Sequence, residues 1–452
     1  MVSQATMPQR GTHVDHKTKH ILIVGGGYVG LYTGLRLQHR LRRELRSGEV
    51  RITIIDPQSY MTYQPFLPEA AAGNLSPRHV VTPLRRMLPK VRILNGRVTK
   101  VHHAEKTVTF QPAAGPSEEL SYDIIVMAAG SVSRTLPIPG LADAAIGFKT
   151  VGEAIALRNR VLALFDRADS TDDEQVRRRA LTFVVVGGGF AGVEALAELE
   201  DMGRDAVRYY ESLSEDGLRW VLVEASDRIL PEVGPEMGAW TLEQLRARGI
   251  EVKMRTLLKS CEGGRVVLSD GETFESATIV WTAGVKPSPV AHAGDLPLDE
   301  RGRIKTSPRL TVVGTRDAFA AGDVAGVPDL TNPGQYCAPN AQHAVRQAKV
   351  LADNIVSTVR GRPLRDYRHR YAGSVAGLGL HKGVANVYGI KLHGLPAWFM
   401  HRTYHLSRVP TLNRKVRVVA DWTLALFFKR ETVSLGEIES PREEFRAAAT
   451  TG

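Results

Sequence analysis

The feature that most constrains the fold is a glycine-rich segment near the start of the chain. Residues 21–24 are apolar and mostly β-branched, which is typical of a buried parallel strand. They run directly into Gly25, Gly27 and Gly30, which match the pattern G-x-G-x-x-G. In this pattern the first glycine permits a tight turn, the second lets a pyrophosphate approach the backbone, and the third allows close helix packing.

The residues around this turn follow the order of a dinucleotide-binding fold. After Gly30, leucines recur at four-residue steps, which predicts a helix whose first N–H groups face the phosphates. The next strand, residues 50–55, ends in Asp56, whose carboxylate suits a ribose hydroxyl pair. The glycine pattern alone is a weak signal, because any strand–turn–helix can need glycines. Strand, turn, helix, strand and terminal acid in this order make it strong.

The same arrangement occurs a second time. Residues 181–186 form an apolar run that leads into Gly187, Gly189 and Gly192, and the strand after the next helix ends in Glu224. A strand–turn–helix that merely needs glycines could match this pattern once, but two such matches in one chain are much less probable. Two dinucleotide folds indicate two bound dinucleotides, and therefore transfer of electrons or of a hydride between them.

Each copy closes with a strand that ends in Ala-Gly, at Gly130 and at Gly284. Past Pro287 the chain is expected to return to the first fold, where Gly322-Asp323 offers a carboxylate for a hydroxylated cofactor chain. We therefore predict an α/β protein with two Rossmann-like domains, the second inserted into the first. The expected boundaries are 18–140 and 291–392 for the first domain, 141–290 for the second, and 393–452 for a C-terminal region.

Charge and cysteine usage limit the remaining options. The chain of 452 residues has 59 Lys and Arg against 48 Asp and Glu, an excess that could serve an anionic membrane, nucleic acid or anionic cofactors. Residues 1–19 carry no apolar core, so we expect no secretory signal, and no window of uncharged apolar residues is long enough to predict a transmembrane helix. Cys261 and Cys337 lie far apart without C-x-x-C, so we expect free thiols rather than a long-range disulfide.

Together these motifs resemble the two-dinucleotide flavoprotein reductases, in which the first fold holds FAD and the inserted fold holds NAD(P)H. Within that group the chain is similar to the type II NADH:quinone dehydrogenases, which are single-subunit enzymes that do not pump protons. The finer match rests on residues 67–73, 192–194, 281–285 and 341–344, on the strands from Tyr371, and on the basic aromatic tail.

The resemblance implies FAD as cofactor and NADH as substrate. Asp56 would bind the adenosine ribose, Val98 would meet the adenine, and Asp323 would bind the ribityl chain. The residues implied in FAD binding are Gly25, Gly26, Gly27, Tyr28, Gly30, Asp56, Val98, Ala129, Gly130, Gly322, Asp323, Ala341 and Gln342. Those implied in NADH binding are Gly187, Gly189, Gly192, Glu224 and Gly284. No metal is expected.

Two residues are the implied catalytic candidates. Glu194 matches a glutamate that lies near the nicotinamide and flavin in the family, although an acid in a first helical turn also has a purely structural role. Gln342 would lie at the isoalloxazine beside the quinone entrance. Glu194 or a water near Gln342 would deliver the proton that quinol formation needs, and the sequence leaves this choice open.

The chain departs from the family pattern near the expected quinone site. Arg346 stands where the pattern A-Q-x-A-x-Q has its last glutamine. A cation there would stabilise a reduced, anionic quinone oxygen, or would mark a different acceptor. Lys382 is a further candidate for quinone binding, with a solvated surface lysine as the simpler reading. Asp56 also replaces the more usual glutamate.

The C-terminal segment, residues 395–430, combines apolar, aromatic and basic side chains. Its run Trp422–Phe428 is too short to cross a bilayer, so we expect peripheral binding to an anionic membrane surface, on the cytoplasmic face. Arg402, Arg414 and Arg430 are among the cations expected to face the head groups. A packing helix or a homodimer interface is the alternative. We expect no nucleic-acid partner.

Three other functions remain to be weighed against this reading. A sulfide:quinone oxidoreductase shares the fold but needs cysteines that carry sulfur, and two isolated cysteines disfavour it. A soluble reductase for a protein such as a ferredoxin is disfavoured by the basic aromatic tail. A non-catalytic NADH sensor or membrane scaffold is disfavoured by the intact glycines and Glu194.

Overall fold

The computed structural model of the protein describes residues 18–370, 372–428 and 430–434. The chain forms two compact units, and each contains several separate segments. Unit 1 comprises the described residues up to Met61, together with Pro83–Ser131 and Pro287–His369. Unit 2 comprises Thr62–Thr82, Val132–Lys286 and the described residues from Arg370 onward.

Unit 1 is built on a seven-stranded sheet in the order β20-β8-β1-β2-β5-β6-β7. Strands β20 to β5 in this order pair in parallel, and β5, β6 and β7 pair antiparallel. Strand β1 has a parallel neighbour on each side, and all its residues after Lys19 are buried whichever face of the sheet they point to. Burial on both faces explains its continuous apolar run. The strands are β1 (Lys19–Val24), β2 (Val50–Asp56), β5 (Arg92–His102), β6 (Thr107–Pro112), β7 (Glu118–Ser121), β8 (Ile124–Met127) and β20 (Ala318–Ala320).

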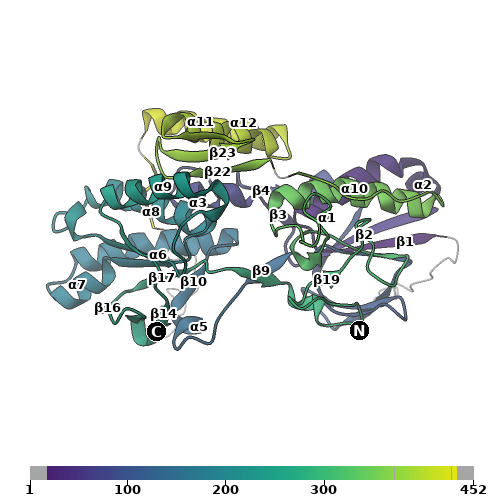
Figure 1. Cartoon of the computed structure of the whole chain (residues 1–452), viewed down its shortest axis with the longest axis horizontal. Helices are drawn as coiled ribbons and strands as arrows, with labels where there is room; N and C mark the ends of the chain where they lie inside the picture. Colours follow the sequence, from purple (N-terminus) through teal and green to yellow (C-terminus); the bar gives the residue numbers. More distant parts are fainter. Residues whose placement is uncertain (1–17, 371, 429, 435–452) are drawn as a thin grey trace, which may run out of the picture. The chain divides into compact units, whose positions relative to one another are not determined.

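Two long helices of unit 1 lie side by side, α1 (Tyr28–Arg40) and α10 (Ala341–Val359) (Figure 1). Arg36 joins them through two hydrogen bonds to Asp353, of 2.7 and 2.8 Å. The remaining helices and small strands are α2 (Arg42–Ser47), α4 (Leu84–Met87), β19 (Ile304–Lys305) and β21 (Ala325–Gly326). Strand β5 is continuous over its length, and its pairing with β6 is irregular between Val98 and Lys100.

Unit 2 repeats the same plan with a five-stranded parallel sheet in the order β10-β17-β11-β12-β13. Its central strand β11 lies between β12, which precedes Glu224, and β17, which precedes the Ala-Gly pair. In unit 1, β1 lies in the same way between β2 and β8. The strands are β10 (Ala145–Gly147), β11 (Thr182–Val186), β12 (Arg219–Val223), β13 (Glu251–Lys253) and β17 (Thr278–Trp281). An antiparallel sheet adds β14 (Leu258–Ser260), β15 (Arg265–Leu268) and β16 (Thr273–Glu275).

Two of the helices that accompany this sheet, α6 and α7, begin with a capping side chain. Thr150 and Glu153 form a reciprocal capping box at α6, which satisfies N–H groups that the helix itself cannot pair. By contrast, α8 begins at Gly189 without any capping side chain. The helices are α5 (Leu141–Ala144), α6 (Val151–Asp169), α7 (Glu174–Ala180), α8 (Phe190–Val207) and α9 (Pro235–Ala247).

A further part of unit 2 combines a three-stranded antiparallel sheet with helices from both ends of the chain. Helix α11 packs on β22 and β23, and α12 follows it (Figure 1). The elements are α3 (Leu67–Ala71), β22 (Gly373–Gly377), β23 (Gly383–Val387), β24 (Ile390–His393), α11 (Leu395–Arg408) and α12 (Leu412–Phe427). None of the described helices is both long enough and apolar enough to span a membrane.

The division of the chain differs from the expected boundaries. Residues 62–82, 132–140 and 370–392 belong to unit 2, whereas the sequence assigned them to the first domain. The reason is tertiary: Gly377 and Asn386 bond to Glu194 and to the Val233 carbonyl, which are both in unit 2. The expected C-terminal region begins as α11 and α12, and its residues 435–452 lie outside the described part.

Short strands also lie at the junctions between segments: β3 (Tyr60–Thr62), β4 (Val81–Pro83), β9 (Ser131–Ser133) and β18 (Val285–Pro287).

Candidate active site

The first glycine-rich turn has the shape that a pyrophosphate needs. Gly25 has φ +108°, and a Cβ there would lie 2.4 Å from the Ala128 carbonyl oxygen. A Cβ at Gly30 would lie 1.8 Å from the Gly25 carbonyl oxygen, so only glycine lets α1 pack this closely. A Cβ at Gly27 would meet nothing within 4 Å, and no side chain caps α1, which begins at Tyr28. The helix N–H groups therefore face open space suited to an anion.

Asp56 holds the same turn from the neighbouring strand. Its Oδ2 accepts a hydrogen bond of 2.6 Å from the Gly26 N–H, and its Oδ1 accepts one of 2.7 Å from the Gln58 N–H. Burial raises the pKa of Asp56 from its ordinary value, while these two bonds oppose the shift. The carboxylate is thus fixed in direction at the end of β2, with remaining lone pairs for a ribose.

The other residues expected around the first dinucleotide also lie in unit 1. Asp323 accepts a hydrogen bond of 2.6 Å from the Ser131 hydroxyl, directly after the Ala129-Gly130 end of β8. Gly322 has φ +73°, and its N–H donates to Gln347 Oε1 at 2.7 Å. Val98 is buried on β5.

The second glycine-rich turn repeats this geometry in unit 2. Gly187 has φ +115°, and a Cβ at Gly192 would lie 1.9 Å from the Gly187 carbonyl oxygen. Cβ atoms at Gly189 and at Gly284 would meet nothing within 4 Å. Glu224 Oε2 accepts a hydrogen bond of 2.5 Å from Gly188, and its Oε1 accepts one of 2.7 Å from Ser226. Glu224 therefore occupies the place in unit 2 that Asp56 has in unit 1.

Glu194 lies in the first turns of α8, two residues after Gly192, and is buried. Its Oε1 accepts a hydrogen bond of 2.8 Å from the Gly377 N–H at the end of β22. The same oxygen lies 3.2 Å from Nε2 of His401 on α11. Three elements distant in sequence therefore meet at one carboxylate oxygen. The sequence singled out Glu194 but missed both of its partners.

A second buried carboxylate, Glu69, faces two residues that the sequence assigned to the membrane surface. Its Oε2 accepts hydrogen bonds from the Arg402 guanidinium at 3.2 Å and from the Trp422 indole at 2.6 Å. The Arg402 guanidinium also lies over the Trp398 and Trp422 rings, at 4.2 and 4.7 Å. The expectation that Arg402 faces the lipid head groups is therefore wrong, because a buried carboxylate binds it inside unit 2.

Two more charges of the C-terminal segment have internal partners. Arg430 is almost fully buried and pairs with Asp205 at 2.8 Å, which contradicts its expected place at the head groups. Asp421 accepts hydrogen bonds from the Ser76 N–H at 3.1 Å and from His79 at 2.5 Å. Next to Glu69, Glu198 is buried and accepts a bond of 2.8 Å from Asn74.

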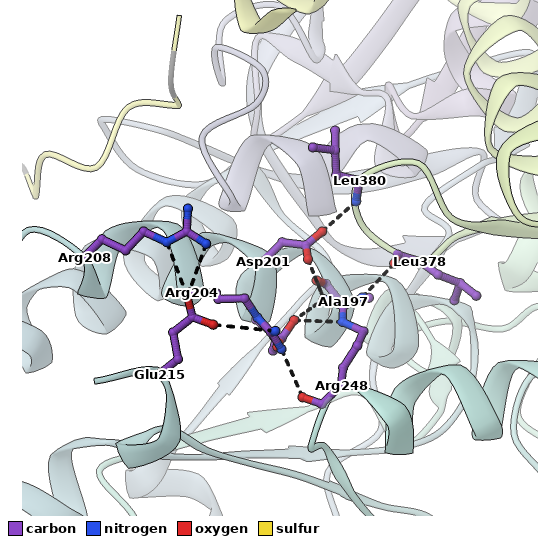
Figure 2. A network of polar contacts seen from close by, with 9 residues as sticks. Ala197, Asp201, Arg204, Arg208, Glu215, Arg248, Leu378 and Leu380 are labelled. Atoms are coloured by element: carbon purple, nitrogen blue, oxygen red, sulfur yellow. Dashed lines mark hydrogen bonds and ion pairs between the residues drawn. The ribbon is translucent and has the colours of Figure 1, made fainter. Parts of the chain in front are cut away.

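A network of arginines and carboxylates fixes the turn after β22 on α8 (Figure 2). Arg248 donates to the carbonyls of Leu378 and Ala197, each at 2.8 Å, and to Asp201 at 2.7 Å. Asp201 also accepts the Leu380 N–H at 2.6 Å. Because this network holds the turn that follows Gly377, it keeps the Gly377 N–H against Glu194.

The first two turns of α10 carry the residues expected at the flavin and the quinone. Asn340 caps the helix by accepting the His343 N–H at 2.8 Å. Gln342 and Arg346 are half-buried, and Gln342 Oε1 lies 3.0 Å from His369 Nε2. Burial and the Arg346 charge lower the pKa of His369 to about 4, so this ring is neutral at pH 7. No pattern in the sequence indicated a role for His369.

The candidate quinone residues are divided between the two units. Gln342 and Arg346 lie in unit 1, whereas Glu194 and Lys382 lie in unit 2. Lys382 is half-buried in the turn between β22 and β23, where its carbonyl accepts the Leu378 N–H at 2.9 Å. Within unit 2 this turn joins Lys382 to the β22 end that contacts Glu194.

Both cysteines are free and buried, as expected. Burial, with the charge of Asp329, raises the pKa of Cys337 to about 11, and burial likewise raises the pKa of Cys261. Both groups are therefore protonated thiols at neutral pH, and neither has the properties of a reactive cysteine.

Comparison with known proteins agrees with this geometry. The family model for pyridine nucleotide-disulphide oxidoreductases matches residues 19–348. A type II NADH:quinone oxidoreductase of Staphylococcus haemolyticus is 31% identical over 85% of this chain and 93% of its own. The type II NADH:quinone oxidoreductase Ndh of Mycobacterium tuberculosis is 27% identical over 94% and 91%.

Among solved structures, NDH2 of Plasmodium falciparum in complex with NADH has the same fold. The TM-score is 0.84 at 18% identity, over 92% of this chain and all of that one. The sequence comparisons and the duplicated turns lead to one assignment. The chain is a member of the pyridine nucleotide-disulphide oxidoreductase family, and within it of the type II NADH:quinone oxidoreductases.

Proposed function

We propose that this protein oxidises NADH and transfers two electrons through FAD to a membrane quinone, without pumping protons. The overall reaction is NADH + H⁺ + quinone → NAD⁺ + quinol. The observation that carries the proposal is the repeated turn: in each unit an acid, Asp56 or Glu224, anchors the turn beside an open helix N-terminus. Two such turns serve two dinucleotides, and the curated relatives carry the names of NADH:quinone oxidoreductases.

FAD belongs in unit 1 and NADH in unit 2. The cradle from Gly25 to Tyr28 would hold the flavin pyrophosphate, Asp56 its ribose, and Asp323 its ribityl hydroxyls. When bound, FAD supplies the capacity to take a hydride and to release two electrons. The nicotinamide dinucleotide would lie on Gly187–Gly192, with Glu224 at the adenosine ribose and Glu194 nearer the reacting end.

The quinone would approach the first turns of α10. Gln342 is held through its side-chain oxygen by His369, which orients the amide for a ligand. The Arg346 guanidinium, one turn further along the helix, donates to the Gln342 carbonyl at 3.0 Å and places a positive charge there. That charge would stabilise a reduced quinone oxygen. Lys382, in unit 2, is a further candidate for contact with the quinone.

The outer face of the C-terminal helices suits an anionic membrane surface on the cytoplasmic side. Its most exposed apolar residues are Phe399, Leu412, Val416, Leu424, Leu426, Phe427 and Phe428. Arg408 and Arg417 are exposed cations on the same two helices. Apolar side chains with neighbouring cations describe an interfacial anchor, and a bilayer is where a quinone dissolves. The competing occupant of this face is a second copy of the chain.

The main rival function receives no support from the cysteines. A sulfide:quinone oxidoreductase would need thiols that attack and carry sulfur. Cys261 and Cys337 lie in different units, and both are buried with raised pKa values. A soluble ferredoxin-type reductase would have no use for the exposed apolar face of α12.

Purified protein tests the proposal. It should be yellow without added cofactor, and the flavin released by acid should be FAD. NADH oxidation should be measured with short-chain and long-chain quinones, ferricyanide and oxygen. Turnover with quinones well above that with oxygen is the expected result. A colourless protein that cannot be reconstituted with FAD would refute the flavin, and NADH oxidation by ferricyanide alone would refute the quinone.

A further inference from the structure

Glu194 has a buried partner that the expected mechanism does not use. His401, in the middle of α11, is 4% exposed, and its Nε2 lies 3.2 Å from Glu194 Oε1. The two atoms are within ion-pair distance, and among the described residues this buried nitrogen has no partner with hydrogen-bond geometry, so Glu194 is the group it faces. The backbone at Gly377 leaves room for the pair, since a Cβ there would lie 3.4 Å from the His401 ring.

The groups that surround this pair determine its charge. Helix α3 contributes Glu69, α8 contributes Glu198, and α11 contributes Arg402 and His405. Burial and neighbouring carboxylates raise the pKa of Glu198 to about 7, so much of it is protonated at neutral pH. Arg402 is bound to Glu69. This leaves the Glu194 carboxylate without a neutralising partner unless His401 is protonated.

The pKa values of the two histidines of α11 are shifted in opposite directions. Burial alone would lower the pKa of His401, but contact with Glu194 and the charges of Glu69 and Glu198 raise it above the ordinary value. Burial and the charge of His401 lower the pKa of His405, whose ring lies 4.6 Å away. His405 contacts the Tyr63 hydroxyl at 3.1 Å rather than a carboxylate. One turn of helix thus separates a ring whose pKa is raised from one whose pKa is lowered.

We propose that His401 stores a proton for Glu194, and that this pair supplies the proton that quinol formation requires beyond the hydride. The inference rests on the proposed NADH:quinone activity and adds to it the source of the proton. The Nε2–H bond of His401 breaks, the proton passes through Glu194 Oε1, and an O–H bond forms on the reduced quinone oxygen. A proton from solvent then restores the imidazolium. The electrons come from NADH, so no other reductant is needed.

His401 acts through Glu194, so its test must separate proton supply from structural support. His401→Gln removes the proton store, and His405→Gln removes a neighbouring buried histidine as the matched control. Each variant is assayed with a short-chain quinone, whose reduction consumes a proton, and with ferricyanide, whose reduction consumes none. FAD content and single-turnover reduction of the flavin by NADH check that each variant is folded and binds NADH.

For His401→Gln we expect the ratio of quinone to ferricyanide turnover to fall about 10-fold or more, within the range for loss of a general acid. The fall should be smaller at low pH, where solvent supplies protons more readily. Flavin reduction by NADH should stay within about twofold of wild type, because hydride transfer takes up no proton. In His405→Gln the ratio and its pH profile should match wild type. An unchanged ratio in His401→Gln, or an equal loss in both variants, would overturn the proposal.

A second measurement needs no turnover and no His401 variant. In protein labelled with ¹³C at histidine Cε1, one signal should titrate above 6.5, the ordinary pKa of histidine. In Glu194→Gln that signal should titrate at or below 6.5, since the amide keeps the Gly377 bond but lacks the charge. Absence of such a signal, or its persistence in Glu194→Gln, would overturn the stored proton. This result holds whichever acceptor the enzyme uses, so it separates failure of this inference from failure of the proposed quinone activity.

Discussion

The indole nitrogen of Trp422 donates a hydrogen bond to the Glu69 carboxylate across 2.6 Å, so α12 is bonded directly to α3 inside unit 2. The Trp422 ring also meets Phe66 edge-on, with ring centroids 5.6 Å apart. One face of α12 is thus part of the interior, and the other face carries the exposed apolar side chains. The C-terminal segment therefore has two roles that substitutions can separate.

Trp422→Phe tests the interior role. It keeps an aromatic ring but removes the only indole donor to Glu69 among the described residues, which leaves a buried carboxylate with Arg402 alone. We expect the free energy of unfolding to fall by about 2 kcal/mol, as for loss of a hydrogen bond to a charged group. Urea denaturation of the FAD-bound protein measures it. Phe428→Leu, at an exposed position, should change stability by less than about 0.5 kcal/mol, and a similar loss in both variants would contradict the assignment.

Replacing Leu424, Leu426, Phe427 and Phe428 together with serine tests the membrane role. These side chains are exposed, so the protein should fold and retain FAD. Binding to phosphatidylglycerol vesicles should be lost, and activity with long-chain quinone should fall much more than activity with ferricyanide. Leu257→Ser is the control at another exposed apolar residue. Point substitutions are cleaner than deletion after Pro396, which would also remove His401 and Arg402.

Two results would reject the membrane anchor. One is sedimentation of the fourfold variant with vesicles to the same extent as wild type. The other is loss of a dimer in the variant without loss of vesicle binding, which would assign this face to a second copy of the chain.

Glu224 should make the enzyme prefer NADH to NADPH. Its carboxylate would bond the ribose 2′-hydroxyl and repel a 2′-phosphate, and we expect kcat/KM to differ about 100-fold or more. Glu224→Gln keeps an oxygen for the Gly188 N–H but removes the charge, so its kcat/KM for NADPH should rise about 10-fold. Initial rates with both nucleotides measure this. Equal kcat/KM values in the wild type would refute the role of Glu224.

Glu194→Gln should retain FAD, because Glu194 contacts β22 and α11 rather than a glycine-rich turn. Turnover with quinone should fall about 10-fold or more. Stopped-flow reduction of the flavin by NADH reports whether the side chain also acts at the nicotinamide. If flavin reduction and turnover both equal those of wild type, Glu194 serves only the helix dipole and the packing of β22.

His20 should make unit 1 sensitive to acid. Its ring lies between the Ser121 carbonyl at 2.7 Å and the Thr53 hydroxyl at 2.8 Å, and burial, aided by Arg51, lowers its pKa to about 4. The unfolded chain binds a proton near pH 6.5 and the folded chain does not, so stability falls as the pH drops from 6.5 to 4. The loss is on the order of 3 kcal/mol.

Thermal unfolding from pH 4 to pH 8 checks this dependence. His20→Gln should flatten the decline on the acid side, whatever it does to stability at pH 8. His39→Gln, on the exposed last turn of α1, is the matched control and should keep the wild-type slope. A slope unchanged in His20→Gln would assign the acid sensitivity to other groups.

The sequence was sufficient for the parts of the site that depend on local backbone shape. Gly25, Gly30, Gly187 and Gly192 are confirmed as positions where a Cβ would collide with the backbone. That requirement acts over a few residues, so a short motif reveals it. Asp56 was predicted in the same way, because β2 runs parallel to β1 and its last residue therefore lies beside the glycine-rich turn.

The sequence was insufficient where a charge is buried by a partner far along the chain. Arg402 and Arg430 looked like surface cations because no local pattern reveals Glu69 or Asp205 beside them. No local pattern indicated that Glu69, in the segment 62–82, is the buried carboxylate that contacts Arg402 of α11 and Trp422 of α12. His401 was missed for the same reason: a single histidine in a helix has no signature until its partner is known.

The short spacing between Gly192 and Glu194 on α8 has a thermodynamic consequence. Gly192 and Glu194 lie in the same turn of α8. Gly192 packs against the turn proposed to hold the nucleotide, and Glu194 contacts His401 of α11. A helix rises only about 1.5 Å per residue, so nucleotide and proton act on one rigid element. Any change that NADH causes in the proton affinity of the pair must be matched by an equal change that protonation causes in NADH affinity. Binding of the nucleotide and protonation of the Glu194–His401 pair are therefore linked through the first turn of α8.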